Sequence, residues 1–304
     1  MTNGGAPLVS ICVPSIGRTE FLPAVREAIA AQTLQDFEVL VLDNACGSEA
    51  RAFFAIWQSA EPRVRVLPVD ERLPMFANFD RGALASKGKY VAFFHDDDVY
   101  APQFLGRAVG MLEREPQAGV CGSNFNFVDE HAVLTGSRRW IAKDEVWAGR
   151  RYIHTLLERG KNVIPMPGLV YRREVFRIHG FDIGVPMYWG DLSVLMRYAE
   201  TWDMAMIAEP IMSVRRHGGQ ASVNKDAFEG YAIRTELMNK YLDGYLQRHP
   251  LEYVFVGQMR RAVARNERNH TIFSRVVRWT QERSPKGAET VLRAARNLSQ
   301  RFGL

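Results

Sequence analysis

Four adjacent residues offer the clearest chemistry in this sequence: His95, Asp96, Asp97 and Asp98. They follow an apolar run at 90–94 that has the character of a buried strand. Three neighbouring carboxylates repel one another, so a chain that gathers them at a strand end usually compensates with a cation. Clustered oxygen ligands suit Mg²⁺ or Mn²⁺, which complete their shells with water and phosphates. A solvated acidic turn is the alternative, and the position after a strand favours the metal.

The elements that must position these acids alternate between strand and helix. The predicted strands are 8–13, 37–43, 64–69 and 90–94, and the predicted helices are 20–32, 50–60 and 78–87. The first strand is expected to end at Pro14, before a turn through Gly17. Strands that are nearly continuous apolar runs predict a parallel sheet covered on both faces. Such sheets bind ligands beyond the carboxyl ends of their strands, where Asp43 and the three acids fall.

The remainder of the chain changes character twice. Between about 120 and 225 many prolines and glycines interrupt the pattern, which suits loops and short strands that build a pocket. From about 226 onward the chain is expected to be helical, and its last stretch, near 291–302, is amphipathic and basic. Residues 241–304 hold 12 Lys/Arg and 5 Asp/Glu, whereas the rest holds 27 and 29. The excess positive charge therefore lies in the C-terminal region.

Composition narrows the class of protein and its compartment. Hydrophobic residues make up 47% of the 304 residues, enough for a sizeable core without disulfides. Three scattered cysteines and no C-x-x-C motif argue against a disulfide framework or a zinc site. Neither a signal peptide nor a membrane-spanning run is evident. We expect a cytoplasmic protein, and no nucleic-acid-binding signature is present.

A series of short segments then follows one family's order. The longest is N-F-D-R-G-A-L-A-S-K-G-K-Y-V-A-F-F-H-D-D-D-V-Y-A-P-Q-F at 78–104. The others are V-S-I-C-V-P-S-I-G-R at 9–18, A-A-Q-T at 30–33, F-E-V-L-V-L-D-N at 37–44, P-G-L-V-Y-R-R-E-V-F at 167–176, G-F-D at 180–182, G-D-L-S-V-L-M-R at 190–197 and R-R-H-G-G-Q-A-S at 215–222. Together they resemble the family-2 inverting glycosyltransferases of the nucleotide-diphospho-sugar transferase superfamily. Each segment is weak alone, but the series is specific and covers roughly residues 8–225.

The resemblance implies a GT-A fold, a Rossmann-like α/β architecture with a mixed, mostly parallel sheet flanked by helices. It implies a glycosyltransferase domain over 1–225, with a nucleotide-binding half at about 1–120 and an acceptor-binding half at about 121–225. A basic helical C-terminal extension over 226–304 would follow. Residues that the resemblance assigns to the nucleotide-sugar donor are Pro14, Ser15, Ile16, Arg18, Asp43, Arg72, Asn78 and Asp96.

The resemblance also implies metal ligands and a base. Asp97 corresponds to the main ligand of Mn²⁺ or Mg²⁺, with Asp98 beside it, and His217 to a histidine close to metal and diphosphate. Asp191 corresponds to the general base. Each position has a simpler interpretation: Asp191 as a helix N-cap, His217 as a structural histidine, and Asp43 as a turn cap.

Two positions depart from the family pattern. Asp80 stands where the family usually has Asn, and Gly190 where an acid usually precedes Asp191. The first would alter helix packing or donor contacts, and the second leaves Asp191 as the sole carboxylate of its motif. The aromatic residues Trp147, Tyr188 and Trp189 would stack on an acceptor sugar or, as is commoner for such residues, belong to a core.

The expected activity is metal-dependent, inverting transfer of a single sugar from a nucleotide-diphosphate sugar, with UDP-sugars favoured. The acceptor would be a hydroxyl of a glycan or lipid-linked molecule in surface polysaccharide or glycolipid synthesis. The Q-x-x-R-W motif of processive synthases is absent. A sugar-phosphate nucleotidyltransferase and a catalytically dead nucleotide-sugar-binding protein are the alternatives. The basic C-terminal helices are expected either to contact the inner membrane face peripherally or to be merely solvated.

Overall fold

A computed structural model describes residues 5–160, 162–181, 190–218 and 227–283. The chain divides into two compact units, one of residues 1–153 and 163–221 and the other of residues 154–162 and 222–304. The predicted domain boundary near residue 225 stays a prediction, because it falls outside the described residues.

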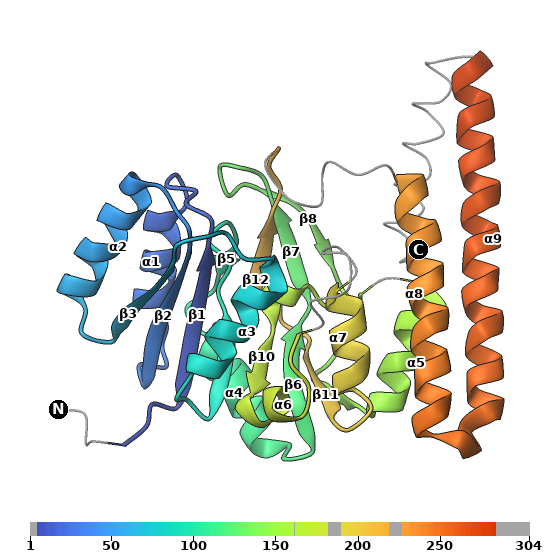
Figure 1. Ribbon diagram of the computed structural model, residues 1–304, viewed down its shortest axis with the longest axis horizontal. Helices are drawn as coiled ribbons and strands as arrows, with labels where there is room; N and C mark the ends of the chain where they lie inside the picture. Colours follow the sequence, from blue (N-terminus) through green and yellow to red (C-terminus); the bar gives the residue numbers. More distant parts are fainter. Residues whose placement is uncertain (1–4, 161, 182–189, 219–226, 284–304) are drawn as a thin grey trace. The chain divides into compact units, whose positions relative to one another are not determined.

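The first unit is built on a large mixed sheet (Figure 1). In the described part of the chain its order is β3 (Val64–Val69), β2 (Phe37–Asn44), β1 (Val9–Ser15), β4 (Tyr90–Phe93), β10 (Val170–Arg172), β6 (Ala118–Ser123), β11 (Asp203–Ile207) and β9 (Glu145–Trp147). The first four strands run parallel, β10 is antiparallel to both its neighbours, β6 and β11 are parallel, and β9 is antiparallel. The sheet is therefore mixed and mostly parallel.

Seven helices of the described chain belong wholly or in part to this unit. They are α1 (Leu22–Ala30), α2 (Ser48–Ala60), α3 (Met75–Ala85), α4 (Phe104–Arg114), α5 (Gly149–Arg159), α6 (Arg173–Ile178) and α7 (Gly190–Tyr198). The predicted helices at 20–32, 50–60 and 78–87 correspond to α1, α2 and α3 with shifts of a few residues at the ends. A short 3-10 turn, Met166–Gly168, precedes β10.

The sheet is covered on both faces because its strands are apolar on both. Alternate residues such as Ile11 and Val39 share one buried core with Val25 of α1 and Phe54 of α2. The intervening residues face α3, where Gly82 packs so closely that an added Cβ would lie 2.7 Å from Leu42 Cδ1. Strands that point apolar side chains both ways match the continuous apolar runs of the sequence. The cysteines, all free, are buried in this unit.

The first strand is longer than predicted, because β1 continues through Pro14 to Ser15. The Cys12 carbonyl accepts a hydrogen bond from the Phe94 amide, so Pro14, two residues on, turns its nitrogen to the same side. On that side β4 has already ended at Phe93. The missing N–H of proline therefore interrupts no ladder, and the prediction that Pro14 ends the strand is wrong.

A second, smaller sheet lies at the carboxyl end of β4. Its order is β5 (Val99–Tyr100), β12 (Met212–Arg215), β7 (Phe125–Val128) and β8 (Leu134–Arg138). Strand β5 follows directly after His95–Asp98, and β12 pairs with it antiparallel. Residues far apart in the chain are thereby brought to the same acidic loop.

The second unit contains a helical hairpin. Helix α8 (Ala227–Arg248) and helix α9 (Tyr253–Arg283) are joined by a 3-10 turn at Pro250–Glu252. Buried side chains such as Leu242, Tyr245 and Met259 fill their contact. Helices therefore occupy the described part of the region where they were predicted, and the predicted basic helix near 291–302 lies outside the described residues. None of the helices in the described ranges is both long and apolar enough to traverse a bilayer.

Candidate functional site

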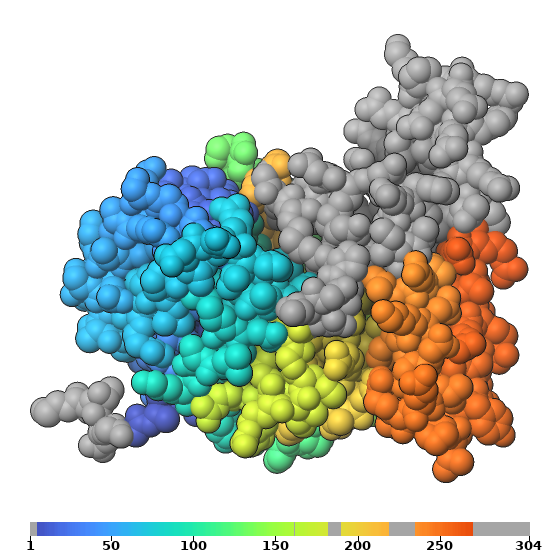
Figure 2. All heavy atoms as spheres, in the orientation of Figure 1, coloured from blue at the N-terminus to red at the C-terminus, as the bar shows by residue number. Residues whose placement is uncertain are grey.

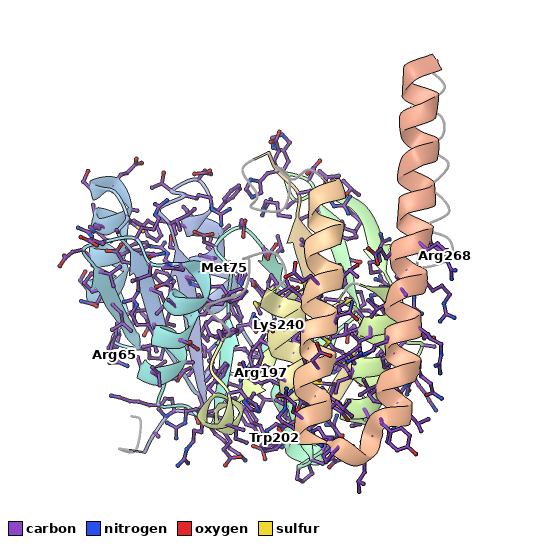
Figure 3. The ribbon with its side chains drawn as sticks, turned by 45° about the vertical axis from the view of Figure 1, so that its right-hand side comes forward. Arg65, Met75, Arg197, Trp202, Lys240 and Arg268 are labelled. Carbon is purple, nitrogen blue, oxygen red and sulfur yellow. The ribbon has the colours of Figure 1, made fainter. Side chains whose placement is uncertain are left out.

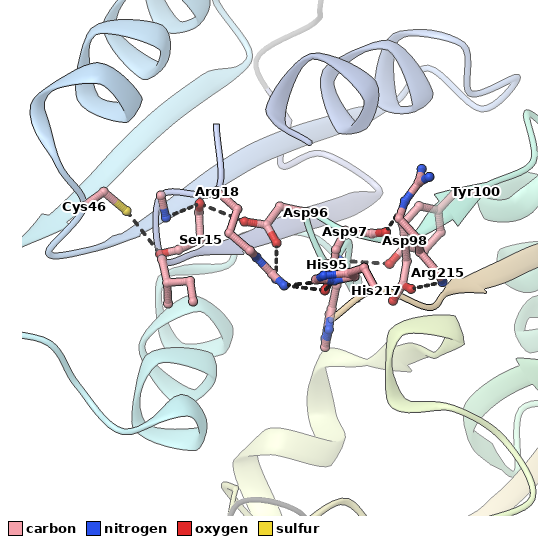
Figure 4. A network of polar contacts seen from close by, with 12 residues as sticks. Ser15, Arg18, Cys46, His95, Asp96, Asp97, Asp98, Tyr100, Arg215 and His217 are labelled. Atoms are coloured by element: carbon pink, nitrogen blue, oxygen red, sulfur yellow. Dashed lines mark hydrogen bonds and ion pairs between the residues drawn. The ribbon is translucent and has the colours of Figure 1, made fainter. Parts of the chain in front are cut away.

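The site begins where β1 and β4 end side by side. Parallel pairing of the two strands brings the loop after β1 next to the loop after β4. The Ser15 hydroxyl donates to Asp96 Oδ2 over 3.0 Å. Arg18 donates through Nη2 to Asp96 Oδ1 and through Nη1 to Asp97 Oδ2, both at 2.5 Å (Figure 4). The Arg18 guanidinium thus lies between the carboxylates of Asp96 and Asp97. We call Asp96, Asp97 and Asp98 the acidic cluster.

The smaller sheet holds the acidic cluster from its other side. The Arg215 amide on β12 donates to Asp98 Oδ1 at 2.9 Å, and the Arg215 Nε donates to the Asp97 carbonyl at 2.8 Å. His217 follows, with its Nε2 3.1 Å from Asp97 Oδ2 and 3.4 Å from Arg18 Nη1. Arg18 and His217, two predicted site residues that are 199 positions apart in the chain, are therefore in contact. Arg215 was missed as a positioning residue, although it belongs to the R-R-H segment that supplied His217.

Burial dominates the electrostatics of the acidic cluster. It raises the pKa of Asp96 to about 6, although Arg18 opposes the shift. Burial and the neighbouring Asp97 charge raise the pKa of Asp98 well above its ordinary value. Burial acts in the same direction on Asp97, but Arg18, His95 and a hydrogen bond from His217 bring its pKa below the usual range. The cluster therefore carries less charge than three acids in water would.

The residues present fit a divalent cation. His95, Asp97 and Asp98 each offer a ligand atom, and these atoms lie within 4.8 Å of one another. The buried Nε2 of His95 has no hydrogen-bond partner among the described residues. Burial lowers the pKa of His95 to about 4, so the ring is neutral, as a metal ligand must be. His95 was not predicted as a ligand, though its place beside three acids was the available signal.

The residues that were predicted to bind the nucleotide-sugar donor from neighbouring loops lie at the same edge of the sheet. Asp43, at the end of β2, accepts from the Cys46 amide at 2.8 Å and from Arg51 Nε at 2.9 Å. It therefore caps a turn, and its contact with a nucleobase stays a prediction. Arg72 donates through Nη2 to the carbonyl of Ile16 over 3.4 Å, which brings the loop after β3 against the loop after β1.

Asn78 plays a part inside α3. It is buried, and its Oδ1 accepts from Arg81 Nη2 at 2.6 Å, while Arg81 Nη1 donates to the Leu67 carbonyl. These bonds fix α3 against the end of β3. A direct contact between Asn78 and the donor remains a prediction.

Asp191 lies in the first turn of α7 and is half-buried. Its Oδ1 accepts from the amide of the next residue, Leu192, at 2.8 Å, whereas an N-cap side chain accepts from an amide two or three residues further on, so this bond is not a capping bond. Burial raises the pKa of Tyr152 and Tyr171, two fully buried tyrosines, and the charge of Asp191 raises it further. Its role as a base stays a prediction.

Of the two departures from the family pattern, Gly190 has a packing explanation, and Asp80 makes a hydrogen bond that the Oδ1 of an Asn could also accept. A Cβ on Gly190 would lie 1.8 Å from Cε2 of Phe76, so an acidic side chain has no room there. Asp80 accepts at Oδ1 from the Phe181 amide at 2.7 Å, which ties α3 to the chain that follows α6. Helices α3 and α6 adjoin at the surface as cyan and yellow-green atoms (Figure 2).

Of the aromatic residues considered for the acceptor, Trp147 is buried in the core at 5% exposure. Its ring contacts Tyr152, and the Arg151 guanidinium lies over it at 4.2 Å from the ring centre. Tyr188 and Trp189 lie outside the described residues.

Sequence comparison extends the resemblance to named relatives. Residues 10–179 match the family described as Glycosyl transferase family 2. An uncharacterized glycosyltransferase of Haemophilus influenzae is 30% identical over 238 residues, which are 72% of each chain. The uncharacterized protein y4gI of Sinorhizobium fredii is 33% identical over 184 residues, 57% of this chain and 20% of that protein. The O-antigen biosynthesis protein RfbC of Myxococcus xanthus is 26% identical over 205 residues, which cover 64% of this chain and 16% of that protein. This chain thus spans about a fifth of y4gI and less of RfbC.

Solved structures show the same architecture. S. aureus TarS 1-349 in complex with UDP-GlcNAc has a TM-score of 0.58 and 14% identity, covering 77% of this chain and 66% of that one. Mannosyltransferase PcManGT from Pyrobaculum calidifontis, in complex with GDP-Man and Mn²⁺, has a TM-score of 0.53 and 14% identity. The match covers 97% of this chain and 81% of that one. These likenesses confirm the predicted GT-A fold. The family match over residues 10–179 and the Haemophilus influenzae relative identify the chain as a member of glycosyltransferase family 2.

Proposed function

We propose that this glycosyltransferase binds its nucleotide-diphosphate sugar through a divalent cation, Mn²⁺ or Mg²⁺, at the acidic cluster. The observation that carries the proposal is the convergence of His95, Asp97 and Asp98 within 4.8 Å, beside His217 and Arg18. Oxygen and imidazole ligands at the carboxyl ends of parallel strands suit a cation that shares its shell with phosphates. The Mn²⁺ complex of PcManGT supports the same class of ion.

The donor is proposed to be a UDP-sugar. UDP-GlcNAc is bound by the similar structure TarS, whereas PcManGT holds GDP-Man, so guanine is the next base to test. Asp96, joined to Ser15 and Arg18, would face the ribose, and Asp43 would face the base. Arg18 has a guanidinium that can turn from carboxylates to diphosphate, because its planar fork of N–H donors can pair with two oxygens of either group.

Transfer is proposed to be a single displacement with inversion at the anomeric carbon. When bound, the cation would neutralise the charge that develops on the leaving diphosphate. Asp191 takes the proton from the acceptor hydroxyl as that oxygen attacks, since an alcohol is a poor nucleophile at neutral pH. Gly190 contributes no second carboxylate, so one acid in this motif carries that role.

The acceptor is proposed to be a glycan or lipid-linked hydroxyl in surface polysaccharide or glycolipid synthesis. The similarity to the O-antigen biosynthesis protein RfbC supports this setting. We place the enzyme in the cytoplasm, in peripheral contact with the inner membrane face through its basic C-terminal region. Family membership disfavours a nucleotidyltransferase, and a binding protein without turnover is distinguished by assay.

Donor binding is tested first by thermal unfolding with UDP, GDP, dTDP and CDP, each with and without Mn²⁺. A ligand at 100 times its Kd stabilises the folded state by about 2.7 kcal/mol. We expect a Mn²⁺-dependent rise in Tm with UDP that Asp97→Ala abolishes and that Asp36→Ala, at an exposed site, retains. If no nucleotide raises Tm in the wild type, the donor proposal fails.

The base is tested by Asp191→Asn. We expect transfer to fall by about 10²-fold or more while the nucleotide-dependent rise in Tm persists. Glu174→Gln, on the exposed surface of α6, is the matched control and keeps wild-type transfer. Near wild-type transfer by folded Asp191→Asn would show that another group takes the proton.

A further inference from the structure

Three large apolar side chains lie exposed at the turn between α8 and α9. Leu251 is 91% exposed, Tyr253 67% and Val254 57%. The next residues, Phe255 and Val256, are buried, so the α8–α9 contact is filled without the exposed three. Single surface apolar residues are ordinary, but neighbouring ones mark an interaction site. We call Leu251, Tyr253 and Val254 the apolar tip.

A row of arginines begins two turns further along α9. Arg261, Arg265 and Arg268 are exposed, and with Val254 and Gln258 they are spaced by four, three, four and three residues. This spacing places all five on one face of the helix. Arg268 is drawn pointing away from α8 (Figure 3). Within the described ranges these three arginines, the arginine row, form neither an ion pair nor a hydrogen bond, whereas the adjacent Arg260 pairs with Asp243.

The arginine row borders an open groove of about 400 Å³. Arg261 and Arg265 line it from α9, and His154 and Glu158 line it from the end of α5 in the same unit. The Glu158 carboxylate is turned to His154, with Oε2 3.4 Å from Nδ1. Two guanidinium groups against one carboxylate leave the groove positive, so it suits an anionic partner.

We propose that the apolar tip and the arginine row together bind an anionic lipid surface. An apolar tip needs a partner with an apolar interior, and the arginines need a partner with many phosphates at its surface. A bilayer offers both along one helix, because Val254 and Arg268 are about 21 Å apart along α9. Stable attachment to a membrane usually requires such a pair of signals, and tyrosine prefers the headgroup region. This inference rests on the membrane location given under the proposed function, and it assigns that location a defined surface.

Other partners match only half of this surface. Nucleic acid would satisfy the arginine row and leave the apolar tip exposed to water. A second copy of the chain would cover the tip, but it would set the same arginines near one another, where like charges repel. Both partners are outcomes of the test below.

The test measures binding of the whole chain to vesicles of phosphatidylcholine alone and of phosphatidylcholine with 30% phosphatidylglycerol, in low and high salt. Each arginine near an anionic leaflet tightens binding roughly fivefold. We expect Arg261→Gln/Arg265→Gln/Arg268→Gln to weaken binding to the anionic vesicles by about tenfold or more. Leu251→Ser/Tyr253→Ser/Val254→Ser should remove the binding that persists in high salt.

Two controls have the same chemistry at other sites. Arg26→Gln/Arg150→Gln/Arg177→Gln changes the net charge equally, and Ile56→Ser alters an apolar residue that is 64% exposed on α2. Both should bind vesicles like the wild type. Equal binding to both vesicle types, or unchanged binding by both test variants, overturns the proposal. So does a tip variant that alters only the oligomeric state in light scattering, or a row variant that alters only oligonucleotide binding. The nucleotide-dependent rise in Tm is measured in parallel, so failure of donor binding is recognised separately.

Discussion

At the scale of single residues, Arg18 is the cation of the acidic cluster in the structure. Its guanidinium contacts carboxylate oxygens of Asp96 and Asp97 at 2.5 Å and lies 3.4 Å from His217. A divalent cation that engages Asp97 must compete with it. A nucleoside diphosphate offers Arg18 another anion, so nucleotide and metal are expected to promote each other's binding.

This competition predicts how Arg18→Met behaves. Without nucleotide, Mn²⁺ binding should tighten by about tenfold, because the variant leaves Asp97 without its resident cation. The enhancement of Mn²⁺ binding by UDP should shrink as well. Titration calorimetry measures both, with Arg26→Met on the exposed surface of α1 as control. Unchanged Mn²⁺ affinity in Arg18→Met would contradict the competition.

The buried acids also predict a pH dependence of stability without metal. Since the pKa of Asp96 is raised from 3.8 to about 6 and that of Asp98 is raised too, the native state holds protons that the unfolded chain releases. The free energy of unfolding therefore falls as pH rises from about 4 through 6. Asp98→Asn should raise it at pH 7 by about 1 kcal/mol or more and have little effect near pH 4. Denaturant titrations at both pH values measure this, and an equal effect at both would refute the electrostatic cause.

The sequence revealed the acids but not the contacts that govern them. His95–Asp98 stood out because three adjacent carboxylates follow an apolar strand. Arg215 and Arg18 act on this group from 117 and 78 residues away, and such distances depend on strand pairing that residue types do not encode. Family resemblance supplied Arg18 and His217, but it assigned neither to a contact with Asp97.

At the scale of elements, the start of α7 is fixed by a glycine against an aromatic ring. Phe76 of α3 lies where any side chain on residue 190 would project. The same ring stacks on Phe181 at 5.7 Å between centres. Glycine thus stands in place of the family's usual acid, because α3 and α7 pack closely at this point. This packing positions the turn that carries Asp191.

Gly190→Ala tests this packing. The added Cβ would lie 1.8 Å from Phe76, so we expect a loss of about 1–3 kcal/mol in the free energy of unfolding. In the Phe76→Leu background the same change should cost less, and a double-mutant cycle in urea measures the coupling. Gly47→Ala, where a Cβ meets nothing within 4 Å, is the control. Equal losses in both backgrounds would show that Phe76 is not the obstacle.

Strand and helix positions were the most predictable level of structure. The runs at 37–43 and 90–94 became β2 and β4, because a buried parallel strand must be apolar on both faces, and the run at 64–69 became the partly exposed edge strand β3. The predicted end of the first strand at Pro14 was wrong. Whether the missing N–H of a proline breaks a ladder depends on where the neighbouring strand β4 ends, and the sequence does not show that. The register of the smaller sheet, which places Arg215 on Asp98, has no comparable signal in the chain.

At the scale of the whole molecule, the second unit is assembled from two distant parts of the chain. Asn266 of α9 donates through Nδ2 to the carbonyls of Leu157, at 3.1 Å, and Glu158, and so caps the last turn of α5. Asn266→Ala should lower the free energy of unfolding by about 1 kcal/mol, because these carbonyls lose their partner. Asn269→Ala, at an exposed position, is the matched control in urea unfolding. No difference between the two would mean that water replaces the cap.

This arrangement has a consequence during synthesis on the ribosome. The end of α5 is made about 100 residues before Asn266, and elongation proceeds at about 5–20 residues per second. For roughly 5–20 seconds, therefore, the nascent chain carries the buried Leu157 and its neighbours without the helix that caps them. The second unit can close only after residues 163–221 of the first unit have been made, so its closure is a late step in the folding of the chain.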